Sequence, residues 1–111
     1  MKRLVLEMGV GADLEGADTT KAACRAVEDA LRHLYMPLFR ARDLDESLMA
    51  IEVTVAAQRP EAVDPASVAA LFPYGTVRVV PVHGGLDIDH PQTGTRSVIV
   101  DVAIDVRHPM A

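Results

Sequence analysis

The feature that most constrains the fold is a strict alternation of side-chain type near the carboxyl end of the chain. Between residues 96 and 106, large aliphatic residues occupy every second position, at 98, 100, 102, 104 and 106. Because successive side chains of a β-strand point to opposite faces, this pattern predicts a long strand with one buried face. Such a strand needs partner strands and a covering layer. Half of the 111 residues are hydrophobic and 24% are charged, which is typical of one globular domain over residues 1–111.

The rest of the chain divides into elements by hydrophobic period and by punctuation. We predict a strand over 3–8, a glycine-bearing loop over 9–18, a helix from 18 or 19 to about 35, a loop around 40–46, a strand over 48–58, a helix over 64–71 and a strand over 76–82. In the first strand, Leu4, Leu6 and Met8 share a face, and Arg3, Val5 and Glu7 share the other.

Local signals set the bounds of the two helices. Asp18 or Thr19 can cap the first helix, and Pro37 interrupts it. The second helix begins with the N-cap Asp64 followed by Pro65. In the last predicted strand before the carboxyl-terminal one, Pro81 favours an edge position.

The element order is therefore β-α-β-α-β-β, which predicts an α/β protein, specifically an α+β two-layer sandwich. We expect parallel crossovers through the helices and a hairpin of the last two strands, giving a mixed four-stranded sheet with both helices on one face. The other face would mix charged and apolar residues, among them Glu7, Glu52, Arg78, Asp101 and Asp105. Such a face suits neither water nor a core, so we expect a homo-oligomer, a trimer or a multiple of one, with a polar cleft between subunits.

Charge and composition exclude several classes of protein. The formal net charge is −5, with Lys and Arg scattered, so we expect no nucleic-acid partner. The basic start meets Glu7 too early for a signal peptide, and no window is apolar enough to cross a membrane, so we expect a cytoplasmic protein without a membrane partner. The single cysteine, Cys24, lies in an Ala-rich amphipathic pattern and reads as a buried thiol. No cofactor is expected.

The strand, glycine loop and first helix form the leading candidate for a ligand site. Main-chain N–H groups at a helix start carry partial positive charge, and Arg25 one turn on would reinforce it. The expected ligand-binding residues are Gly9, Gly11, Asp18, Thr20, Arg25 and Arg78. Against this, Asp13, Glu15 and Asp18 would repel a free anion, and a capped helix on a tight turn explains the same pattern.

Candidate catalytic residues are Lys21, Glu7, Asp13 and Glu52. Lys21 beside Arg25 could act as base or nucleophile, or it could be a solvated helix lysine. The carboxylates would handle protons in a partly desolvated cleft, unless Arg78 neutralises them. We predict no metal site. His83, Asp87, Asp89 and His90 offer donors within eight residues, but they lie on a predicted turn without a paired-ligand motif.

Segment 7–31 (EMGVGADLEGADTTKAACRAVEDAL), with 72–75 (FPYG) and 84–86 (GGL), resembles a family of small uncharacterised bacterial and archaeal proteins of about this length. That resemblance implies no reaction. Segment 15–22 (EGADTTKA) is similar to a Glu-Gly-x-Asn-Asp-Phe-Thr-Arg segment of ring-opening amidohydrolases, the cyanuric acid hydrolase and barbiturase group, with Lys21 where that segment has Arg. Those chains contain three α/β repeats, each contributing a Ser–Lys pair, so the likeness implies a trimer of single repeats. The element order is also similar to trimeric folds of the chorismate-mutase and enamine-deaminase type.

Three functions follow as hypotheses. The first is an enzyme that hydrolyses cyclic amides or imines, binding a small polar or anionic metabolite in an inter-subunit cleft. The second is a non-catalytic module that binds such a metabolite at the same loop. The third is a structural oligomer whose charged face only directs assembly.

Overall fold

The computed structural model describes residues 1–34 and 44–110. The elements are β1 (Lys2–Asp13), α1 (Thr19–His33), the 3₁₀ turn η1 (Glu46–Leu48), β2 (Ala50–Ala57), the 3₁₀ turn η2 (Pro60–Ala62), α3 (Pro65–Ala69), β3 (Thr76–His83), β4 (Leu86–His90) and β5 (Thr95–His108). The predicted helix end near Tyr35 and Pro37, and most of the loop expected around 40–46, lie outside the described residues.

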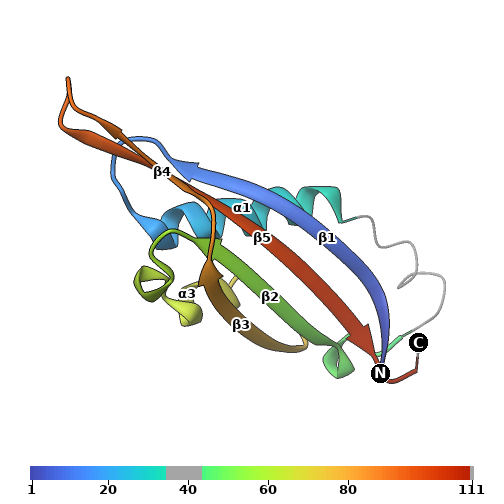
Figure 1. The fold of residues 1–111 in the computed structure, drawn as a ribbon. Helices are drawn as coiled ribbons and strands as arrows, with labels where there is room; N and C mark the ends of the chain where they lie inside the picture. Colours follow the sequence, from blue (N-terminus) through green and yellow to red (C-terminus); the bar gives the residue numbers. More distant parts are fainter. Residues whose placement is uncertain (35–43, 111) are drawn as a thin grey trace.

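The long strand β5 organises the sheet. The strand order is β1-β5-β2-β3, and β4 pairs with β5 as an additional strand (Figure 1). β5 runs antiparallel to β1, β2 and β4, whereas β2 and β3 are parallel. The α+β two-layer architecture and the edge position of β3 are thus confirmed.

The predicted sheet needs three corrections. It has five strands, because residues 86–90, expected as turn, form β4. The last two predicted strands are not a hairpin, because β5 turns back on β4 at Gly94, whose φ is +73°. β1 and β2 are not neighbours, because β5 inserts between them and pairs with both. A strand of 14 residues that alternates over most of its length can serve three partners along two edges.

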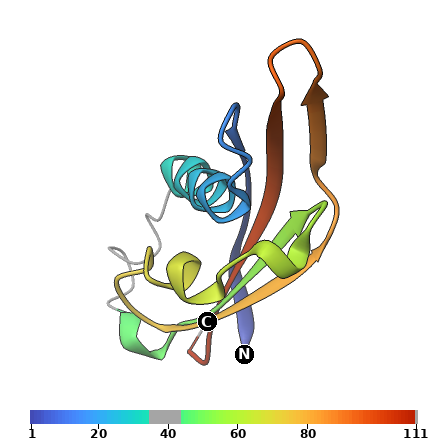
Figure 2. The same cartoon turned by 90° about the vertical axis from the view of Figure 1, so that its left-hand side faces the viewer.

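Both helices cover one face of the sheet (Figure 2). α1 lies over β1 and β5, and its buried stripe is rich in alanine, comprising Ala22, Ala23, Ala26, Val27 and Ala30. Asp18 caps α1 by accepting the N–H of Lys21 at 3.0 Å, and Asp64 caps α3 by accepting the N–H of Ala66 at 3.2 Å, so both predicted caps are confirmed.

Residues 9–13 of the expected glycine loop are instead the second half of β1, and only residues 14–18 connect β1 to α1. A Cβ atom on Gly9 or Gly11 would overlap the backbone of α1 at Ala22, Ala26 or Ala30. These two glycines therefore let the helix approach the strand closely, and neither has positive φ. The prediction that they belong to a loop that wraps a ligand is wrong on this structural point.

The same contact reverses the predicted faces of β1. Because Gly9 and Gly11 lie under α1, Glu7 alternates onto the helix side, and it stands opposite the buried Ile104. Leu6, Met8 and Val10 then fall on the face without helices, where they are 45%, 67% and 52% exposed. We call this face the open face. The expectation that Glu7 lies on it and that Leu6 and Met8 are core residues is wrong.

The molecule is elongated, with extents of 54 × 23 × 19 Å, because the β4–β5 hairpin projects beyond the helical layer (Figure 1). Within the described residues, no helix combines the length and apolar character needed to cross a bilayer.

Candidate functional site

The sheet separates the predicted site residues into two groups. Lys21 and Arg25 belong to α1, on the helix side. Glu52 and Arg78 lie on the open face, where they pair at 3.2 Å. A single chain therefore does not bring Lys21 to Glu52. The pairing of Arg78 with Glu52 is the alternative stated above, in which Arg78 neutralises a carboxylate of this face.

Two main-chain N–H groups around the start of α1 are already bound by nearby carboxylates. Asp13 is buried and accepts the N–H of Asp18 at 3.0 Å, while Asp18 accepts the N–H of Lys21. The hydrogen bond from the N–H of Asp18 is the main reason that the pKa of Asp13 lies below its ordinary value, and the N–H of Gly16 and the charges of Lys21 and Arg25 lower it further. The helix start is thus used for capping, which is the alternative left open above.

The pH dependence of stability should reveal the role of Asp13. Its folded-state pKa is lowered, so its contribution is present above the unfolded value of 3.8 and is lost as pH falls through the folded value. We expect Asp13→Asn to lower the free energy of unfolding at neutral pH, with the difference from wild type shrinking under acid. Urea unfolding across pH measures this. Glu28→Gln, which removes an exposed carboxylate of α1, is the control, and an equal pH profile for both variants would contradict the assignment.

Thr20 connects α1 to the segment before α3, and Cys24 connects it to α3 itself, where the thiol lies 3.9 Å from the carbonyl of Ser67. The Thr20 hydroxyl donates to the carbonyl of Ala62 at 3.1 Å and accepts the N–H of Asp64 at 2.9 Å. Burial raises the pKa of the Cys24 thiol, with Glu28 adding to the effect. The thiol is therefore protonated near neutral pH, and these two side chains hold the helical layer together rather than face a ligand.

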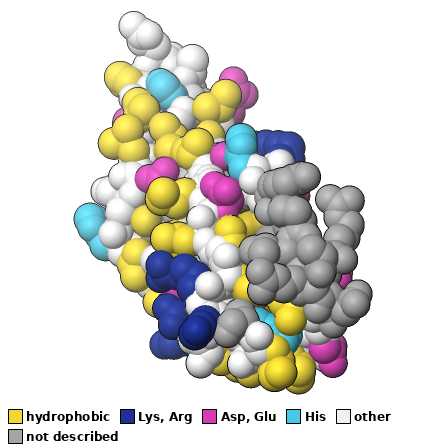
Figure 3. Space-filling view, turned by 90° about the vertical axis from the view of Figure 1, so that its right-hand side faces the viewer, with side chains coloured by type: hydrophobic (Ala, Val, Ile, Leu, Met, Phe, Trp, Pro, Cys, Tyr) yellow, Lys and Arg dark blue, Asp and Glu magenta, His cyan; other side chains and the backbone are white. Residues whose placement is uncertain are grey.

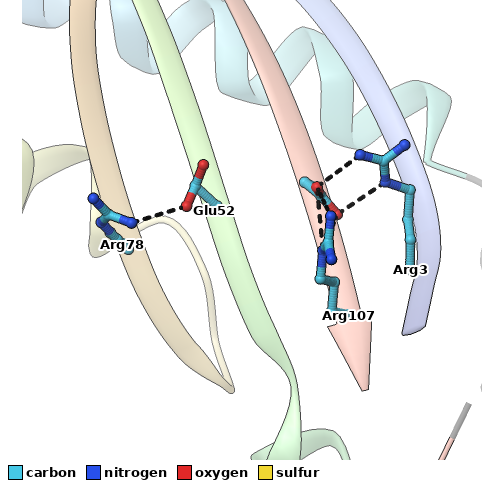
Figure 4. A network of polar contacts seen from close by, with 5 residues as sticks. Arg3, Glu52, Arg78 and Arg107 are labelled. Atoms are coloured by element: carbon cyan, nitrogen blue, oxygen red, sulfur yellow. Dashed lines mark hydrogen bonds and ion pairs between the residues drawn. The ribbon is translucent and has the colours of Figure 1, made fainter. Parts of the chain in front are cut away.

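The open face is charged at the end where β1 begins. Asp105 pairs with Arg3 at 3.1 Å and with Arg107 at 3.2 Å, next to the Glu52–Arg78 pair (Figure 4). The hydrogen bond from Arg3 is the main reason that the pKa of Asp105 lies below its ordinary value, and Arg107 adds to it. This end is an ion-pair network with three guanidinium groups and two carboxylates.

A hollow of about 420 Å³ lies at the other end of the molecule. It is formed between the loop after β1 and the tip of the β4–β5 hairpin, and it is lined by Leu14, Glu15, His90, Gln92, Thr93, Thr95 and Ser97. Six of its seven described lining residues have polar side chains, including one carboxylate and one imidazole, and much of the remaining wall is formed by their carbon atoms and by Leu14. None of the described residues that line it is Lys or Arg.

A hydrogen-bonded chain holds the two sides of this hollow together. The buried Ser97 hydroxyl donates to the carbonyl of Leu14 at 2.8 Å, and its Oγ lies 2.7 Å from Nε2 of His90. A serine has one proton to donate, and the carbonyl can only accept, so His90 must be the donor in the second bond. Nε2 of His90 therefore carries a proton, and in the neutral ring Nδ1 is an acceptor.

The sequence analysis considered His90 only as a candidate metal ligand and assigned no role to Ser97 at the ligand site. The hairpin register explains why they meet: Ile88 pairs with Ser97 and His90 with Thr95, so these side chains share one face. Asp87 and Asp89 alternate to the other face, where Asp89 pairs with Arg96 at 2.6 Å. In the described part of the chain, no three donors gather as metal ligands. Recognising residues 86–90 as a strand would have found the pair.

The outer edge of β1 is closed by its own molecule. Asp29 accepts the N–H of Val10 at 3.0 Å, and Arg25 donates to the carbonyl of Ala12 at 2.7 Å. Glu7 accepts the N–H of Met8 at 3.0 Å. These side chains satisfy groups that would otherwise recruit another strand, and the bond to Val10 is the main reason that the pKa of Asp29 is lowered.

Comparison with known proteins gives a family but no activity. A family model described as "Conserved hypothetical protein (Lin0512_fam)" matches residues 3–106. A crystal structure described as that of an FtsZ-like protein of unknown function from Nostoc punctiforme is 34% identical, with a TM-score of 0.82, covering 95% of this chain and 93% of that chain. No curated protein matches.

Proposed function

We propose that this chain, which belongs to the Lin0512_fam family of conserved hypothetical proteins, is a self-assembling protein that binds a small polar molecule between its subunits. The observation that carries the proposal is the continuity of the open face with the hairpin hollow. Exposed apolar side chains run along both strands that lead to the hollow: Leu6, Met8 and Val10 on β1, and Leu86 and Ile88 on β4.

The exposed apolar side chains of β1 and β4 form a surface rather than standing as isolated residues. Figure 3 shows hydrophobic side chains gathered over the upper part of one side of the molecule, with Lys and Arg gathered below them. Leu14, which is 65% exposed, extends the surface from the end of β1 to the wall of the hollow. A contiguous apolar patch of this kind usually marks a protein interface or a ligand groove.

A second copy of the chain is the occupant that the surface favours. The open face has net positive charge at the Arg3–Arg107 end and the exposed Asp101 nearer the hairpin. A copy laid across it in the opposite direction therefore matches charge as well as apolar surface, as an isologous contact requires. A depression of about 370 Å³ beside Met8 offers room for a partner side chain, and it reaches the outer edge of β1, where Asp29 of α1 contributes to its lining together with Gly9, Val10, Asp101 and Val102.

Face-to-face packing is favoured over extension of the sheet. Joining β1 to a partner strand would require the outward groups of Val10 and Ala12, and Asp29 and Arg25 already bind them. The open face carries no comparable cover within the described residues. A copy packed on it would also wall the hollow, because His90 lies on the same face of the hairpin as Ile88.

Binding is better supported than hydrolysis of cyclic amides or imines. Ser97 donates its proton to a main-chain carbonyl and receives one from His90, so it is not activated as a nucleophile. Lys21 lies across the sheet from Glu52 and Arg78, and Asp13 is engaged in capping. Within one chain, the residues predicted to be catalytic therefore do not meet at a common site.

Molar mass in solution tests the assembly. We expect light scattering at micromolar concentration to give twice the 11.9 kDa mass of the chain. Met8→Lys should shift the protein to one chain, because it places a charge in the apolar contact. A two-fold pair is the unit that we propose, and the same mass tests the sequence-based expectation of a trimer or a multiple of one.

Met110→Lys is the matched control. Met110 is 74% exposed and Met8 67% exposed, but Met110 follows the end of β5 and does not belong to the apolar residues of β1 and β4. We expect it to leave the mass unchanged. A wild-type protein that remains one chain, or equal effects of the two substitutions, would overturn the proposal.

A further inference from the structure

We propose that the hairpin hollow selects a ligand rich in hydrogen-bond donors, such as hydroxyl or ammonium groups, and rejects anions. The inference rests on the proposed function, since it names the ligand class of the same inter-subunit site. It also departs from the anion expected at the start of α1, because the hollow is a different place with different chemistry.

The hydroxyl protons around the hollow are used inside the protein. Ser97 donates to Leu14, as described above. Thr93 contacts both the carbonyl of His90 at 3.4 Å and the hydroxyl of Thr95 at 2.7 Å. The arrangement that makes both bonds has Thr93 donate to the carbonyl and Thr95 donate to Thr93. Both threonine protons are then used, and the hydroxyl oxygens keep their lone pairs.

The remaining groups are also mostly acceptors. Because Nε2 of His90 donates to Ser97, Nδ1 of the neutral ring is an acceptor. Glu15 adds an exposed carboxylate, and the Gln92 amide brings one acceptor and two donors. A ligand that fits this wall must bring hydrogen atoms to it.

The charges around the hollow independently favour the same class of ligand. Glu15 is the one charged side chain among the described lining residues, and the nearby Arg96 is held by Asp89 at 2.6 Å. An anion would meet Glu15 without a compensating cation, whereas an ammonium group would form a charge-assisted hydrogen bond there. A small polyol or amino sugar is the chemical class that satisfies both conditions.

Three hexoses that differ mainly in charge test the ligand class: glucosamine, glucose and glucuronate. We expect saturable backbone amide shifts at residues 14–15 and 90–97 in nuclear magnetic resonance titrations with glucosamine, weaker binding of glucose and no saturation with glucuronate. Glu15→Gln should weaken glucosamine binding about tenfold. Glu28→Gln, on α1 outside the hollow, should not change it.

The proton positions have their own measurement. Long-range ¹H–¹⁵N spectra of the imidazole should show His90 as the Nε2–H tautomer. A proton on Nδ1 alone, saturation by glucuronate, or no saturation by any of the three sugars would overturn the inference. Wild type and Met8→Lys titrated in parallel separate the two proposals. A wild-type protein that is one chain and still binds glucosamine would remove the assembly but leave the ligand class, whereas an assembled wild type that binds none of the sugars would remove the ligand class alone.

Discussion

Replacing Gly11 by alanine should destabilise the protein by about 3 kcal/mol or more, which corresponds to a fall in Tm of about 15 °C for a domain of this size. The added methyl group would overlap main-chain atoms of α1 at Ala22 and Ala26. Backbone atoms cannot move aside as a flexible side chain can, so α1 must lift from β1 and lose part of its buried alanine stripe. Thermal unfolding followed by circular dichroism measures the change.

Gly94→Ala provides the contrast for this substitution. No atom lies within 4 Å of a Cβ built on Gly94, but its φ is +73°. The substitution there has only the cost of a left-handed backbone, about 1–2 kcal/mol. If Gly11→Ala costs no more than Gly94→Ala, close packing is not the reason for glycine in β1.

Replacing His108 by alanine should lower the free energy of unfolding by about 3 kcal/mol. The ring is completely buried, its Nδ1 accepts the N–H of Met110 at 3.0 Å, and its Nε2 lies 2.9 Å from the carbonyl of Asp45. Since Nδ1 is an acceptor, Nε2–H donates to the carbonyl. Truncation removes two hydrogen bonds and leaves a cavity at the end of β5. Urea unfolding measures the loss.

Two further variants separate the causes. His108→Phe fills most of the volume but leaves both main-chain groups unpaired, so its cost should lie between those of wild type and alanine. His83→Ala removes an exposed histidine at the end of β3 and should change stability by less than about 0.5 kcal/mol. Equal effects at His83 and His108 would show that the buried hydrogen bonds contribute nothing.

Local patterns predicted the fold class and most elements. The caps Asp18 and Asp64 act on their own next turn, and the alternation in β5 reports directly on which face is buried. Such signals need only neighbouring residues, which is why both helices and the central strand could be predicted.

Contacts between distant segments explain the errors. The face of β1 depends on whether Gly9 and Gly11 meet α1, and a hydrophobic period alone favoured Leu4, Leu6 and Met8 as the buried side. The insertion of β5 between β1 and β2 is likewise a pairing choice over long sequence separation.

The candidate site was harder to predict than the fold. Gly84, Gly94 and Pro91 made the hairpin resemble a turn, which hid the register that brings His90 to Ser97. The positive charges of Lys21 and Arg25 favoured the start of α1 as a ligand site, and the sequence predicts the Asp18 cap but does not show that Asp13 also binds a main-chain N–H there.

The contacts of Asp29 and Arg25 with Val10 and Ala12 also bear on how the chain acquires its structure. The outward main-chain groups of β1 find these hydrogen-bond partners only when α1 packs against the strand. β1 therefore completes its hydrogen bonding together with the docking of α1. β1 and α1 are adjacent in sequence, so they can form a cooperative folding unit early, with little loop entropy to overcome. The amide of Val10 is then protected from solvent exchange by the helix rather than by the sheet, although it sits on a strand.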